Sequence, residues 1–253
     1  MKNPLTRFSN RVEDYARYRP TYPAALFDVL KSNCELGETS IIADLGSGTG
    51  ILCELFLRNG NPVFGIEPNA AMRQSAEQRL QEFANFASIA ATAEATTLAS
   101  RSVDFITAAQ AFHWFDRRRA KEEFARILNP EGWVVLIWNE RRLDSTTFLR
   151  DYEDLLLSYG TDYQEVRHEN IEPEIAEFFA PAIFELRSVE NFQHCDYEAL
   201  KGRVCSSSYM PEPGAPNFDS MLSRLAEIFK DNEREGIVTI EYDTKIFYGH
   251  LTV

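Results

Sequence analysis

The stretch Asp44-Leu45-Gly46-Ser47-Gly48-Thr49-Gly50 decides the fold of this chain. The apolar residues 41–43 precede it, and a helical pattern over residues 51–58 follows it. A short apolar run, a glycine-rich turn and a helix make a βα unit. Glycine accepts positive φ and lets backbone N–H groups approach a ligand without a Cβ in the way. Because the start of a helix favours an anion, the turn indicates a ligand site.

The same alternation of strand and helix continues after this turn. Strands are predicted at residues 63–66, 88–91, 103–108 and 133–138, with helices over 69–83 and 117–128 between them. The sequence Asn129-Pro130-Glu131-Gly132 ends the second of these helices. Repeated βα units predict a parallel sheet covered on both faces, which is a Rossmann-like, doubly wound α/β fold.

The pattern changes after about residue 139. Residues 146–159 and 221–229 have helical patterns, the stretch between them is largely irregular and polar, and residues 237–242 and 245–248 are typical of strands. No internal repeat is visible. We expect a single domain with a late insertion rather than two independent units.

Composition excludes several classes of function. The net charge of −13 disfavours nucleic acid and anionic membrane surfaces as partners, and we interpret the basic triplet Arg117-Arg118-Arg119 as a solvated helix face. No apolar run is long enough for stable membrane insertion, and the first residues do not resemble a signal peptide. Four cysteines without a pairing or metal-binding pattern indicate a reducing, cytoplasmic environment, and no metal site is expected.

An acidic residue follows the second strand. Glu67 stands where a carboxylate can accept hydrogen bonds from the ribose hydroxyls of a nucleoside cofactor. Dinucleotide-binding loops follow the pattern G-x-G-x-x-G/A, but the third position here is Ile51. A carboxylate-bearing cofactor such as S-adenosylmethionine (SAM) fits the helix start better, and Asp44 can face its ammonium group. A nicotinamide cofactor and a purely structural turn are the alternatives.

Several blocks now resemble the class I SAM-dependent methyltransferases, in the small-molecule (type 11, trans-aconitate methyltransferase-like) branch. The blocks that carry the resemblance are Asp44 to Gly50, Gly65-Ile66-Glu67-Pro68-Asn69 with Met72, Phe112-His113-Trp114-Phe115, and Arg126 to Trp133. The resemblance covers roughly residues 8–141 and implies a seven-stranded sheet with an antiparallel last strand, supplied by residues 237–251. It does not specify a substrate.

The resemblance, together with the loop chemistry, assigns cofactor-binding residues. These are Asp44, Gly46, Ser47, Gly48, Gly50, Glu67, Pro68, Met72, Thr92, Ala93, Glu94 and Gln110. Many relatives have an acid after the third strand to bind the adenine amino group. Thr92 stands at that position here, so Thr92, the backbone at Ala93, or Glu94 are alternatives for this contact.

Other residues are candidates for contact with the substrate: Tyr15, Tyr18, Arg19, Tyr22, Phe112, Trp114, Trp138 and Arg141. The N-terminal tyrosines and Arg19 form either a lid or a helix that packs on the core. His113 is a candidate general base or a structural histidine. Arg141 either recognises a substrate anion or is a surface residue. Residues 206–211 are a candidate wall of the substrate pocket by family analogy.

The prediction is therefore a SAM-dependent methyltransferase that acts on a small organic molecule and releases S-adenosylhomocysteine (SAH). The alternatives are a non-catalytic SAM- or lipid-binding protein and an NAD(P)-dependent oxidoreductase. Within one domain, we expect an N-terminal lid (1–35), a SAM-binding core (36–140), a helical or irregular insertion (141–235) and a final strand region (236–253). The acceptor atom and the oligomeric state are left open.

Overall fold

A seven-stranded sheet forms the centre of the molecule. The computed structural model describes residues 12–161, 163 and 171–252. The strand order is β3-β2-β1-β4-β5-β7-β6. The first five strands are mutually parallel, and β7 runs antiparallel to both β5 and β6. The strands are β1 (Ile42–Leu45), β2 (Val63–Ile66), β3 (Phe86–Ile89), β4 (Val103–Ala109), β5 (Leu128–Arg141), β6 (Glu185–Cys195) and β7 (Val238–Gly249).

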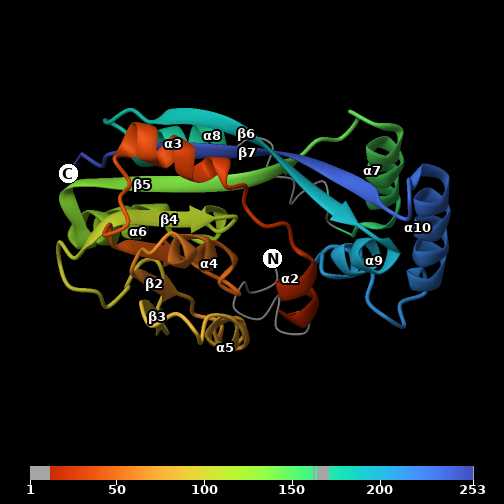
Figure 1. Cartoon of the computed structure of the whole chain (residues 1–253), viewed down its shortest axis with the longest axis horizontal. Helices are drawn as coiled ribbons and strands as arrows, with labels where there is room; N and C mark the ends of the chain where they lie inside the picture. Colours follow the sequence, from red (N-terminus) through yellow and green to blue (C-terminus); the bar gives the residue numbers. More distant parts are fainter. Residues whose placement is uncertain (1–11, 162, 164–170, 253) are drawn as a thin grey trace.

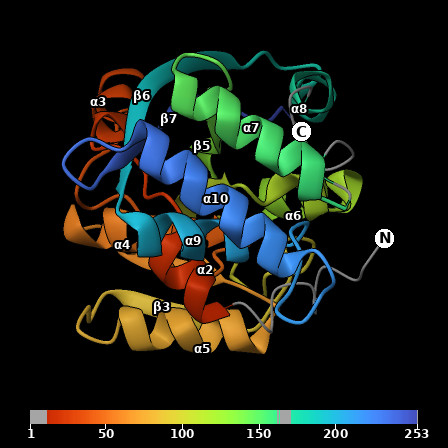
Figure 2. The same cartoon turned by 90° about the vertical axis from the view of Figure 1, so that its right-hand side faces the viewer.

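Helices cover both faces of this sheet, as Figures 1 and 2 show. On one face, α3 (Ala25–Cys34) and α4 (Ile51–Arg58) pack over Ile42, Val135 and Ile137. On the other, α6 (Arg117–Ile127) and α8 (Glu172–Phe179) pack over Val134 and Leu136. Successive residues of β5 thus enter opposite cores, which explains its continuous apolar sequence. The doubly wound fold and the antiparallel last strand are confirmed.

A third cluster of buried side chains lies where β6 ends and β7 begins, and it includes Cys195 and Tyr242 of these strands. It is built by α7 (Thr147–Tyr159), α9 (Tyr197–Cys205) and α10 (Phe218–Asn232), which gather at one end of the molecule in Figure 1. The short helix α2 (Val12–Tyr18) contacts α9 and α5 (Ala70–Arg79). Among the described residues, no helix combines the length and apolarity needed to cross a bilayer.

The region predicted as a helical or irregular insertion also contains β6, which pairs with β7 along its whole length. Its sequence, Glu185 to Cys195, shows little apolar alternation because β6 is an edge strand with most of its side chains partly or fully exposed. The two late strand segments predicted near residue 240 are a single strand, since Thr244 between them is buried and donates to Asn139. The helix predicted to reach residue 83 ends at Arg79.

Candidate functional site

The glycine-rich turn joins β1 to α4 at the carboxyl edge of the sheet. Gly46 and Gly48 both have positive φ, +66° and +57°. A Cβ on Gly46 would lie 2.7 Å from the Cβ of Ala111, so the turn passes tightly against the segment after β4. A Cβ on Gly48 would meet nothing within 4 Å, because this residue borders an open cavity. The backbone of the turn is therefore bare where a ligand can approach it.

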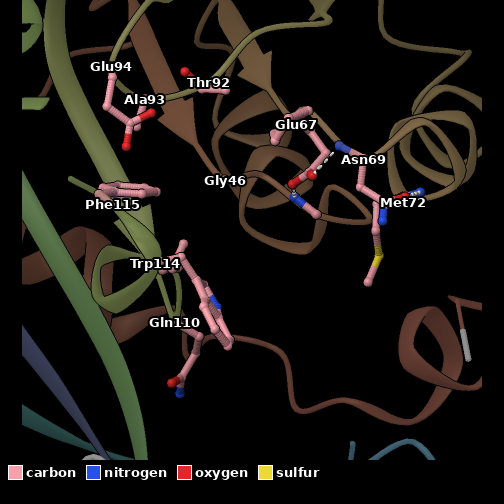
Figure 3. A pocket seen from close by; sticks show the side chains of 14 residues that line it. Gly46, Glu67, Asn69, Met72, Thr92, Ala93, Glu94, Gln110, Trp114 and Phe115 are labelled. Atoms are coloured by element: carbon pink, nitrogen blue, oxygen red, sulfur yellow. Dashed lines mark hydrogen bonds between the residues drawn. The ribbon is translucent and has the colours of Figure 1, made fainter. Parts of the chain in front are cut away.

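The predicted cofactor cavity has a volume of about 260 Å³ and lies where β1, β2, β3 and β4 end. Figure 3 shows Glu67 and Met72 facing Gln110, Trp114 and Phe115 across it. Its lining residues are Gly46, Gly48, Glu67, Pro68, Asn69, Met72, Thr92, Ala93, Glu94, Ala109, Gln110, Ala111, Trp114 and Phe115. Most of the residues predicted to bind the cofactor are thus brought together in one place.

The Glu67 carboxylate is held at the cavity by two backbone N–H groups. Its Oε2 accepts a hydrogen bond from the N–H of Gly48 at 3.0 Å, and its Oε1 accepts one from the N–H of Asn69 at 2.8 Å. The side chain is nearly buried, and this burial raises its pKa above the usual range. A carboxylate has about four lone-pair sites, so acceptor capacity remains for two hydroxyl groups at the cavity.

The helix below Glu67 is fixed by its own cap. The Asn69 side chain accepts hydrogen bonds from the N–H groups of Ala71 and Met72, at 3.0 and 3.1 Å, which starts α5. This start directs Met72 towards the cavity (Figure 3). Across the cavity, Glu94 accepts a hydrogen bond from the N–H of Asp116 at 2.8 Å. Glu94 is thereby tied to the N-terminus of α6.

Three predicted cofactor residues lie outside the cavity lining. Asp44 is buried beneath the turn, where Thr107 Oγ1 donates to it at 2.8 Å and Cys53 Sγ at 3.1 Å. Burial raises the pKa of Asp44 to about 6. Gly50 allows α4 to approach α5, since a Cβ there would lie 2.8 Å from Leu80. Ser47 does not line the cavity either. These three residues therefore support the turn without bordering the cavity.

The segment after β4 divides its residues between cavity and core. Gln110 adopts φ +55°, and its Nε2 donates to the Asn139 carbonyl at 3.1 Å. Trp114 lines the cavity, whereas Phe112 is fully buried with its ring 4.9 Å from that of Phe178. The 3-10 helix Phe112–Trp114 turns the Phe112 side chain into the core, so this predicted substrate contact does not line the cavity. His113 packs on Trp114, with ring centroids 4.5 Å apart, and does not line this cavity.

The N-terminal residues pack on the fold rather than line this cavity. The ring of Tyr18 lies over Gly202 of α9, where a Cβ would be 2.2 Å from it. Arg19 donates to the Ser206 carbonyl at 3.2 Å, and Tyr22 packs against the core beneath α3. The Tyr15 side chain lies outside the described part of the structure. Of the two alternatives for this segment, these contacts favour the docking helix.

A second cavity, of about 150 Å³, adjoins the first, and Gln110 lines both. Two predicted substrate residues, Trp138 and Arg141, line it at the end of β5. Tyr209, from the segment predicted to form a pocket wall, also lines it. The lining residues that sequence reasoning missed include Phe115 in the first cavity and Arg203 in the second. Phe115 directly follows the predicted Trp114, but Arg203 has no comparable local signal.

Comparison with known proteins gives a consistent result. Residues 43–136 match the family model described as "Methyltransferase domain". An uncharacterized methyltransferase-like protein of Schizosaccharomyces pombe is 31% identical over 159 residues, which is 62% of this chain and 60% of that relative. An uncharacterized methyltransferase of Mycobacterium bovis is 35% identical over 134 residues, 53% of this chain and 52% of that protein. The chain therefore spans about half the length of the curated relatives it matches.

The fold has solved counterparts. A structure from Anaeromyxobacter dehalogenans, described as a "Putative Type II Methyltransferase", superposes with a TM-score of 0.71 at 22% identity, over 93% of this chain and 100% of that one. This likeness establishes the fold. The matched segment starts within β1, at the residue before Asp44, and ends in β5, so it includes the turn, Glu67 and the segment after β4. Residues 43–136 thus match a methyltransferase domain, and the chain has the fold of the solved structure that it resembles.

Proposed function

We propose that this protein is a SAM-dependent methyltransferase whose acceptor is a small organic molecule. The observation that carries the proposal is the Glu67 carboxylate, which two backbone N–H groups hold at the border of the cofactor cavity. Since these N–H groups occupy only part of its acceptor capacity, Glu67 suits a ligand with neighbouring hydroxyl groups. The ribose of SAM has such a pair.

The other lining residues fit the remaining parts of SAM. Gly48 presents bare backbone to the cavity close to the start of α4, and this suits the carboxylate of the methionine portion. Met72 and the segment Thr92–Glu94 lie on opposite sides of the cavity in Figure 3, and we place the adenine ring between them. SAM supplies an activated methyl group on its sulfonium. The role of the chain is to bind it, exclude water and align the acceptor.

The proposal of a small acceptor rests on two features. The second cavity adjoins the cofactor cavity at Gln110 and measures about 150 Å³, which suits a molecule of modest size. The net charge of −13 opposes the binding of a nucleic acid backbone. Gln110 belongs to both cavities, and we propose that the methyl group passes beside it.

The experiment is methyl transfer itself. The protein is incubated with methyl-labelled SAM and a panel of small acids, amines and phenols, and SAH is measured by mass spectrometry. Label in one class of acceptor, with an equal amount of SAH, supports the proposal. SAM binding without SAH formation across the panel counts against an enzyme of this acceptor class and favours a non-catalytic SAM-binding protein. A variant with Glu82, an exposed residue, replaced by glutamine serves as the matched control.

A further inference from the structure

The second cavity contains buried cationic donors that the proposed cofactor site does not use. Its polar lining comes from the end of β5, from the middle of β7, from α9, and from Gln110, Tyr163, Glu172 and Tyr209. The residues that line it are Gln110, Trp138, Asn139, Glu140, Arg141, Leu143, Tyr163, Ile171, Glu172, Arg203, Tyr209, Tyr242, Lys245 and Phe247. Arg141, Arg203 and Trp138 each bury a nitrogen that has no hydrogen-bond partner.

Of these three residues, Arg203 gives the strongest indication of a ligand site. It is 8% exposed, and its Nη1 donates to Ser207 Oγ at 3.0 Å. Its Nε is buried without a partner, and among the described residues no carboxylate forms an ion pair with it. Its electrostatic neighbours are the tyrosines Tyr242, Tyr152 and Tyr209. Because neutral hydroxyls do not balance a buried charge, the apo protein bears a desolvation cost here that an anion would relieve.

Arg141 is held in place by its own partners. Its Nη2 donates to Glu153 and, at 2.9 Å, to the Tyr163 hydroxyl, and its guanidinium lies 5.1 Å from the centroid of the Tyr152 ring. The side chain is 9% exposed, and Nη1 is buried without a partner. Glu153 balances the charge of Arg141, but it does not use the free donor. The guanidinium is therefore held in place, and its Nη1 is left without a hydrogen-bond partner.

The remaining charges of the cavity pair with one another. Lys245 Nζ lies 2.6 Å from Glu140 and 3.5 Å from Glu172, and all three side chains are considerably more exposed than the two arginines. Trp138, which is 5% exposed, adds a neutral donor, its Nε1–H. Together with Phe247 it also gives the cavity an apolar wall. The cavity therefore combines hydrogen-bond donors that have no acceptor with an apolar wall. This combination suits a ligand that has a carboxylate attached to a hydrocarbon group.

We propose that the second cavity is the acceptor subsite and that it binds a carboxylate of the methyl acceptor through Arg203 Nε, Arg141 Nη1 and Trp138 Nε1. This inference rests on the proposed function, because it takes the adjoining cavity as the SAM site. The carboxylate serves as the binding handle, which restricts the acceptors to small organic acids. Arg203 and Arg141 determine specificity for charge, whereas the apolar wall accommodates the body of the acid.

The test compares benzoate with benzamide, which has the same shape but no charge. Isothermal titration calorimetry measures both ligands with and without saturating SAH. We expect benzoate to bind roughly tenfold tighter than benzamide, because charge-assisted hydrogen bonds are the stronger ones. Arg203→Gln should remove this preference and leave the affinity for SAH unchanged. Arg142→Gln is the matched control, since Arg142 pairs with Asp243 and Glu190 and does not line the cavity.

A second measurement locates the ligand without an arginine variant. In a ¹H–¹⁵N spectrum, benzoate should shift the indole resonance of Trp138, assigned with Trp138→Phe, and leave that of Trp133 in place. Trp133 packs against His250, with ring centroids 3.8 Å apart, and lines neither cavity. Equal binding of benzoate and benzamide, no binding of either, or an unmoved Trp138 resonance overturns the inference. SAH binding in the same titrations reports on the proposed function separately.

Discussion

Replacing Glu67 with glutamine tests the proposed cofactor contact most sharply. The side chain keeps its length, but one oxygen becomes an N–H₂ group that must face the N–H of either Gly48 or Asn69, both of which now donate to the carboxylate. The amide also has no charge. A hydrogen bond to a charged group contributes about 1.5–3 kcal/mol. If one ribose hydroxyl loses its acceptor and the other bonds to a neutral carbonyl, the loss is about 3 kcal/mol in total.

That loss corresponds to an increase of roughly 100-fold in the Kd for SAH. Isothermal titration calorimetry of SAH with the wild type, Glu67→Gln and the exposed control Glu82→Gln gives the comparison directly. Circular dichroism confirms that each variant is folded. A folded Glu67→Gln variant whose Kd changes less than about threefold would refute the reasoning, because neither the charge nor the second oxygen would then contribute to binding.

Four further outcomes are expected. Gly48→Ala should weaken SAH binding about tenfold or more in calorimetry, and cost about 1 kcal/mol of stability, because φ is +57° and the Cβ would enter the cavity. Unchanged affinity would remove Gly48 from the site. Phe112→Ala should lower the free energy of unfolding in urea by about 3–5 kcal/mol; a fully stable variant would contradict its core position. Burial raises the pKa of Asp44 to about 6, so the folded protein holds the proton of this carboxyl group more tightly than the unfolded chain does. Its contribution to stability should fall by about 3 kcal/mol as the pH rises from about 4 to about 6, and Asp44→Asn should abolish this part of the pH profile in urea titrations. A profile identical in both proteins would disprove the shift. Gly202→Ala should cost about 1–3 kcal/mol because its Cβ would lie 2.2 Å from the Tyr18 ring. In a Tyr18→Ala background the same urea titration should show little cost; an undiminished cost would exclude this contact.

Four of the five parallel strands, β1, β2, β4 and β5, could be predicted because most of their residues in the sheet are buried, whereas the edge strand β3 is only partly buried. Continuous apolar runs such as residues 133–138 follow directly from that burial, and the glycine turn marks where the first strand ends. Strand β6 could not be predicted in the same way. As an edge strand it carries polar residues at most positions, so its pairing with β7 is a tertiary property.

The candidate site shows the same division. Gly46, Gly48 and Glu67 could be predicted because the turn chemistry requires those residue types next to one another in the fold. Phe112 and Trp114 are two residues apart in one short helix, yet of these two only Trp114 borders the cavity. Both are large aromatic residues, so residue type alone does not show which of them faces the cavity. Arg203 reaches the second cavity from α9, far along the chain, so its role depends on how the helices pack.

The central claim is that the cavity beside Glu67 binds SAM. The most direct measurement is isothermal titration calorimetry of the cofactor-free wild type with SAM, SAH and, as the control, NADH. The account predicts micromolar binding of SAM or SAH and no detectable binding of NADH. Failure of both SAM and SAH to bind to demonstrably folded protein, or binding of NADH instead, would contradict it.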